Sequence, residues 1–86
     1  MIIRQFNEAL AREINGKLRY GKIKTRDGYP VRIVCWNAKG RYPIVGLIDR
    51  NGEEVPVRYT YDGKSDYRPN VTTNYDLELH TEGGEG

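Results

Sequence analysis

One stretch decides the fold of this chain: Ile44-Val45-Gly46-Leu47-Ile48-Asp49-Arg50-Asn51-Gly52-Glu53-Glu54-Val55-Pro56-Val57-Arg58-Tyr59. Two runs rich in β-branched residues flank Asn51-Gly52, a pair that supplies the positive φ angles of a two-residue type I′ turn. Such a turn places Ile48 opposite Val55 and Ile44 opposite Tyr59, so the apolar side chains share one face. The stretch therefore predicts an antiparallel hairpin.

A second turn signal, Asp27-Gly28, lies upstream between two further apolar runs. A two-residue loop there would set Ile23 opposite Arg32 and mix apolar with charged side chains on one face. A three-residue loop over residues 26–28, with its glycine in the left-handed conformation, avoids this mixture. The opposed pairs are then Ile23 with Val31 and Gly21 with Ile33. We therefore predict the three-residue loop.

An amphipathic helix is predicted over residues 6–16, before these hairpins. Phe6, Leu10 and Ile14 recur at helical spacing, and Asn15-Gly16 is typical of a left-handed C-terminal cap. After the hairpins, the polar stretch 62–74 predicts a long loop, and an alternating run at 75–80 predicts a last strand.

The fold class that these elements predict is mainly β (α+β). A short N-terminal helix is followed by a five-stranded antiparallel meander, which we interpret as a small SH3-like barrel. A twisted, open five-stranded α+β sheet is the alternative. The 86 residues allow a single domain, which we assign to residues 1–80. Residues 81–86 are predicted to be a disordered acidic tail.

Basic residues are concentrated in the first half of the chain. Residues 1–41 hold ten Lys or Arg and three Asp or Glu, a net charge of +7, whereas the remainder carries −5. In the predicted first hairpin, the outward face carries lysine, arginine and tryptophan side chains, and further basic residues follow in the next connection. The candidate binding residues are Lys22, Lys24, Arg26, Arg32, Trp36, Lys39, Arg41 and Tyr42.

Motifs for catalysis are missing from the sequence. It contains no Gly-x-Ser-x-Gly, no phosphate-binding Gly-x-x-x-x-Gly-Lys-Ser/Thr and no Cys or His pair at metal spacing. The single cysteine, Cys35, is interpreted as a small buried apolar residue, and the single histidine, His80, as an exposed strand residue. We predict that the chain is not an enzyme and uses no cofactor or metal. Without an apolar run of about 18 residues or a secretory leader, it is predicted to be cytoplasmic and not to bind membranes.

The chain also resembles a group of short uncharacterised proteins of gut anaerobes and their phages. The resemblance covers about residues 22–79 and rests on these segments: Thr25-Arg26-Asp27-Gly28, Val31-Arg32-Ile33-Val34-Cys35, Tyr42-Pro43-Ile44-Val45-Gly46-Leu47, Tyr59-Thr60, Asp62-Gly63-Lys64 and Asp76-Leu77. The segment Leu18-Arg19-Tyr20 departs from the shorter linker expected there. The resemblance implies a cytoplasmic, non-catalytic accessory protein of a mobile element and brings no activity or catalytic residue.

Two functional hypotheses follow from the sequence. The first is a binding module of bacterial or phage origin that recognises an anionic partner, either nucleic acid or a nucleotide-like ligand, through the basic first hairpin. Cations beside an exposed aromatic ring suit a phosphate backbone and a stacked base. The alternative is a protein-interaction or inhibitory module that contacts a host protein through an aromatic surface. That surface would contain Tyr29, Trp36, Tyr42 and Tyr67.

Overall fold

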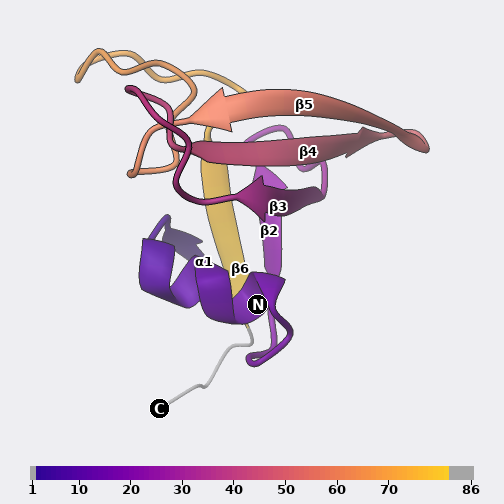
Figure 1. The fold of residues 1–86 in the computed structure, drawn as a ribbon. Helices are drawn as coiled ribbons and strands as arrows, with labels where there is room; N and C mark the ends of the chain where they lie inside the picture. Colours follow the sequence, from indigo (N-terminus) through magenta and orange to yellow (C-terminus); the bar gives the residue numbers. More distant parts are fainter. Residues whose placement is uncertain (1, 82–86) are drawn as a thin grey trace.

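The computed structural model describes residues 2–81 and contains one helix and six strands in that range (Figure 1). In chain order, the elements are β1 (Ile2–Gln5), α1 (Glu8–Asn15), β2 (Lys22–Thr25), β3 (Val31–Cys35), β4 (Ile44–Arg50), β5 (Glu53–Tyr59) and β6 (Leu77–Thr81). The protein is therefore mainly β with one short helix, as the sequence predicts.

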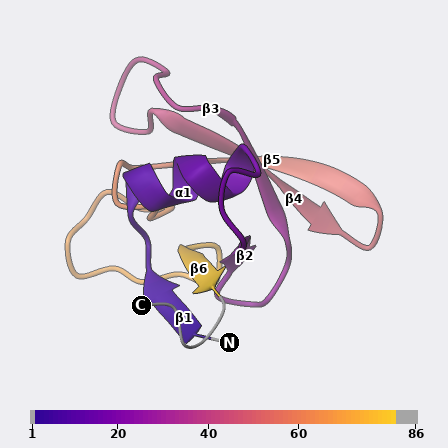
Figure 2. The same cartoon turned by 90° about the horizontal axis from the view of Figure 1, so that it is seen from below.

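The strands form two small antiparallel sheets, with the orders β1-β6-β2 and β3-β4-β5. In Figure 1, β4 and β5 run across the view while β2 and β6 run down it, so the two sheets cross. Viewed from below, α1 lies over β6 on the side that faces the other sheet (Figure 2). Side chains from both sheets and from the helix form one core. Its fully or nearly fully buried members include Leu79, Ile44, Ile48, Tyr59 and Ala11.

The five-stranded meander is wrong, because β6 lies between β1 and β2 and the strands number six in the described chain. An SH3-like barrel is not confirmed, since neither of the two sheets is closed. The strand missed by the sequence analysis is β1, which has no turn signal beside it and pairs with the far end of the chain. Its Ile2 lies opposite Thr81, which therefore ends β6 rather than beginning a tail. The predicted tail residues 82–86 lie outside the described residues.

The β4–β5 hairpin confirms the predicted register, with Ile48 opposite Val55 and Ile44 opposite Tyr59. Both turn residues of Asn51-Gly52 have positive φ angles, 58° and 92°, as a type I′ turn requires. Local turn chemistry and the apolar pattern agree here, and the predicted hairpin forms.

Helix α1 is shorter than predicted and ends differently. The Asn7 side chain accepts a hydrogen bond from the Leu10 N–H at 3.0 Å and caps the N-terminus. At the other end, the left-handed residue is Lys17, with φ 62°, whereas Gly16 has φ −85°. The Leu18 N–H donates to the carbonyl of the third-last helical residue at 2.8 Å, completing a Schellman motif. The predicted left-handed cap at Asn15-Gly16 is thus displaced by one position.

The first hairpin has the predicted loop but does not continue as a ladder. The Thr25 N–H donates to the Tyr29 carbonyl at 3.0 Å, and Gly28 has φ 92°, so the three-residue loop is confirmed. An isolated bridge between Lys24 and Pro30 continues that register. Beyond it, β2 pairs with β6 and β3 pairs with β4, so the two strands separate into different sheets.

The side chain of Asn15 takes the place that the sequence analysis assigned to Gly21 opposite Ile33. Its amide donates to the Ile33 carbonyl at 3.0 Å, and its oxygen accepts from the Ile33 N–H at 2.9 Å. This pair of bonds satisfies the edge of β3 as a neighbouring strand residue would. The predicted Gly21–Ile33 pairing is therefore wrong, and a gap opens between β2 and β3.

Candidate anion-binding groove

A groove of about 450 Å³ occupies the gap between the end of α1, β2 and β3. Its lining includes four apolar core side chains and three charged side chains. All three charged residues are cationic: Lys17, Lys22 and Arg32. A groove with apolar walls and cationic margins suits a ligand that combines an anionic group with an apolar surface.

Backbone geometry holds two of these cations at the margin of the groove. Lys17 is the left-handed residue of the Schellman motif, so its position follows from how the helix ends. Lys22 follows Gly21, whose φ is 154°, a conformation that side chains rarely allow. A Cβ at that glycine would lie 2.9 Å from the carbonyl oxygen of His80. The chain therefore passes close to β6 just before Lys22.

The third cation, Arg32, is shared with Glu54. Arg32 Nε donates to Glu54 Oε2 at 3.0 Å and Nη2 donates to Oε1 at 2.9 Å, a bidentate pair on the protein surface. This hydrogen bonding raises the pKa of Arg32, and the guanidinium in turn lowers the pKa of the Glu54 carboxyl. Lys17 and Lys22 are exposed and form no ion pair with the described residues. The two lysines thus offer charge to a partner without losing an internal contact.

The predicted single face carrying Lys22, Lys24, Arg32 and Trp36 is wrong, because β2 and β3 belong to different sheets. Of these residues, Lys22 and Arg32 still meet at the groove. Lys24 lies on β2 opposite Glu78 of β6.

The sequence leaves open whether Trp36 is exposed or covered by the helix. Trp36 is half-buried and packs against the core, and the Arg12 guanidinium lies 5.0 Å from its ring centroid. The cation from α1 takes the place that a stacked base would need.

Three other predicted residues lie in the connection between β3 and β4, outside the lining of the groove. The Arg41 guanidinium lies 4.1 Å from the ring centroid of Tyr67, whose N–H donates to Tyr42 Oη at 3.3 Å. Lys39 is exposed in the same connection. These contacts tie the β3–β4 connection to the long loop after β5.

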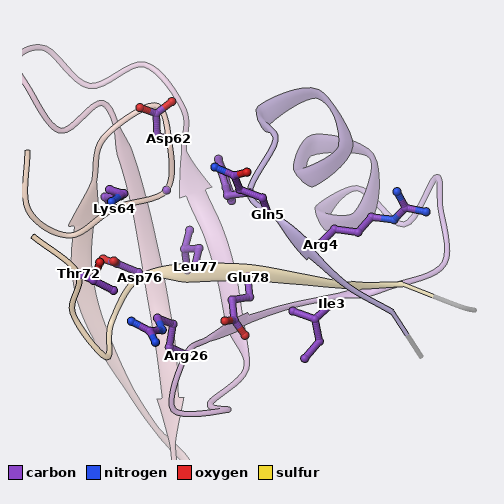
Figure 3. A pocket seen from close by; sticks show the side chains of 12 residues that line it. Ile3, Arg4, Gln5, Arg26, Asp62, Lys64, Thr72, Asp76, Leu77 and Glu78 are labelled. Atoms are coloured by element: carbon purple, nitrogen blue, oxygen red, sulfur yellow. The ribbon is translucent and has the colours of Figure 1, made fainter. Parts of the chain in front are cut away.

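Arg26 lines a different hollow, of about 410 Å³, beside β1 and β6 (Figure 3). Its charged lining is mixed, since Arg26 and two other cations share it with three carboxylates. One of these, Asp76, is buried and accepts hydrogen bonds from the N–H groups of Ser65 and Thr73 at 2.9 and 3.1 Å. This balance of charge makes the hollow a weaker anion site than the groove.

The sequence analysis missed Lys17 as a candidate site residue. The sequence did contain a signal for it. Lys17 directly follows Gly16, the glycine at the end of the predicted helix, so it begins the connection to the next strand. Within the described part of the chain, no group of three or more His, Cys, Asp or Glu residues is placed to hold a metal ion. Nor is any helix in residues 2–81 long and apolar enough to cross a membrane.

Comparisons with protein families, curated proteins and solved structures found no match to this chain. The resemblance to short proteins of gut anaerobes and phages therefore stays a prediction.

Proposed function

We propose that this chain is a non-catalytic binding module for a phosphate-bearing anionic partner, either nucleic acid or a nucleotide-like ligand. The observation that carries the proposal is the groove between β2 and β3, in which every charged lining residue is cationic. A cytoplasmic location and an origin in a bacterium or phage belong to the same proposal and rest on the sequence alone.

The chemistry of the groove supports a phosphate rather than an uncharged ligand. Lysine ammonium groups act as point charges on phosphate oxygens, and an arginine fork can bind two of them. The apolar floor, which includes Ile23 and Val31, gives a base or sugar a surface to cover. Charge attraction and apolar contact would then act on one partner.

Salt dependence tests the proposal. Labelled single-stranded and duplex oligonucleotides and a labelled nucleotide are titrated with the protein at several salt concentrations, with anisotropy as the readout. Each phosphate contact with a single strand changes the slope of log K against log salt by about 0.7. Lys22→Ala is therefore expected to weaken binding and to reduce the slope by about that amount. Lys39→Ala removes an exposed charge outside the groove and serves as the control.

The ion pair at the margin gives a test in the opposite direction. Glu54→Gln removes the carboxylate that occupies Arg32 and is expected to strengthen binding. Asp66→Asn breaks a comparable surface pair with Arg68 and is expected to leave binding unchanged. No salt-sensitive binding of any probe at micromolar protein concentration would refute the proposed function.

A second candidate is the protein-interaction module. Tyr67 of the predicted aromatic surface is 53% exposed, whereas Tyr29, Trp36 and Tyr42 are half-buried, so that surface is smaller than expected. The observation that favours this candidate is the exposure of apolar side chains outside the groove, with Tyr67 at 53% and Val34 at 49%. Capture of a host protein that survives nuclease treatment and is lost in Val34→Glu would support it.

A further inference from the structure

The connection between α1 and β2 places two large apolar side chains in solvent. Leu18 is 84% exposed and Tyr20 is 79% exposed, the two highest values among the large apolar side chains of the described chain. Both lie before β2, which begins only at Lys22. The connection leaves α1 through the Schellman motif and turns back toward β2 at the lower end of the molecule in Figure 1.

This connection forms its own hollow, of about 390 Å³, which adjoins the cationic groove. Residues 17–21 and Ile14 line it, and it shares Ile14, Lys17 and Gly21 with the groove. Tyr20 therefore lines a hollow that has Lys17 in common with the groove, and Lys22 lines that groove. An exposed aromatic ring next to unpaired cations is the arrangement that the sequence analysis sought at Trp36.

We propose that the partner of this groove is a single-stranded nucleic acid, with one unpaired base stacked on Tyr20 and the neighbouring phosphates bound by Lys17 and Lys22. This inference rests on the proposed function and names its partner class. A single strand can present the open face of a base to a protruding ring, whereas the bases of a duplex are already stacked on each other. Lys17 precedes Tyr20 in the chain and Lys22 follows it, which suits a strand that carries a phosphate before and after the base.

Within residues 2–81, no cation lies over the Tyr20 ring as Arg12 lies over the ring of Trp36. The cation–aromatic contacts of the described residues involve Trp36, Tyr67 and Tyr29, but not Tyr20. Stacking on Tyr20 therefore displaces no internal contact of this kind. Arg19 is the remaining cation of the connection, and its Nη1 lies 3.7 Å from Glu13 Oε1. The Tyr20 side chain beside it remains 79% exposed.

Two substitutions at Tyr20 and one modified probe separate the contribution of the Tyr20 ring to affinity from that of the lysine charges. Tyr20→Phe keeps the aromatic face, whereas Tyr20→Leu keeps apolar area without it. The probe is a labelled single strand of about 12 nucleotides, compared with an abasic strand of equal length and with the matched duplex. Since a stacked base contributes a factor of about 5 to 150 in affinity, Tyr20→Leu should weaken binding of the normal strand within that range. Tyr20→Phe should bind it like the wild type.

The abasic strand keeps the phosphates and lacks the bases, so the wild type should bind it more weakly and Tyr20→Leu should bind it equally weakly. Tyr61→Leu changes a tyrosine that is 60% exposed outside the groove and should leave all affinities unchanged. Equal binding of the normal and abasic strands, or tighter binding of the duplex, would overturn this inference. In that event, salt-sensitive binding lost in Lys22→Ala would still support the proposed function, whereas no salt-sensitive binding would end both.

Discussion

The buried hydroxyl of Tyr59 gives the most direct prediction about stability. Tyr59 ends β5 and is fully buried, and its Oη has no hydrogen-bond partner among the described residues. Its ring lies close to Gly46, where an added Cβ would be 3.3 Å from Tyr59 Cε2. Tyr59→Phe keeps this ring contact and removes only the unsatisfied group. Since leaving a buried polar group unpaired costs about 1–3 kcal/mol, the variant is expected to gain about that free energy of unfolding.

The same residue predicts a dependence on alkaline pH. Burial, with smaller contributions from Asp76 and Tyr75, raises the pKa of Tyr59 above its ordinary value of 10.0. Below pH 10 the Tyr59 hydroxyl keeps its proton in both the folded and the unfolded chain. The raised pKa therefore does not make the free energy of unfolding depend on pH in that range. As the pH rises above 10, the unfolded chain releases the proton first, and stability falls by about 1.4 kcal/mol per pH unit. Tyr59→Phe should lack this component.

Urea denaturation of wild type, Tyr59→Phe and Tyr61→Phe at several pH values measures both effects. Tyr61 is 60% exposed, so its substitution should change the free energy of unfolding by less than about 0.5 kcal/mol at neutral pH. A loss of about 1 kcal/mol or more in Tyr59→Phe at neutral pH would show that the hydroxyl has a partner in solution and would refute the reasoning.

Three further substitutions test the contacts around the groove and on the surface. Asn15→Ala leaves one N–H and one carbonyl of β3 without their partners and should cost about 1–3 kcal/mol or more in urea denaturation. Gly21→Ala and Gly28→Ala both place a side chain at a positive φ, but only Gly21→Ala also brings a Cβ within 2.9 Å of a carbonyl oxygen, so it should destabilise the protein more. Hydrogen bonding from Arg68 lowers the pKa of Asp66 to about 2, so an NMR titration should find its midpoint there, and Arg68→Ala should raise it. The sign follows from the depressed pKa: any contribution of this pair to stability is present at neutral pH and is lost as the pH falls toward 2.

The parts of the fold that sequence reasoning predicted correctly depend on neighbours along the chain. The Asn51-Gly52 turn, the loop that ends at Gly28 and the helical spacing around Ile14 each use residues within a few positions of one another. The strand order could not be predicted in this way. β1 and β6 pair through residues such as Ile2 and Thr81, which lie at opposite ends of the described chain. No turn signal beside either strand indicates which strand it pairs with.

The candidate site combines both kinds of information. Two of its charged residues, Lys22 and Arg32, were predicted from the sequence. The groove between β2 and β3 was not predicted. That space exists because Asn15, 18 positions before Ile33, binds the main chain that a continued hairpin would have bound. β2 pairs with β6 and does not continue along β3, and residues of both strands of the hairpin line the groove. A helix-terminal asparagine thus determines the shape of the groove, whereas lysines and an arginine determine its charge. Stability and binding should therefore respond together to changes at Asn15, but separately to changes at Lys22.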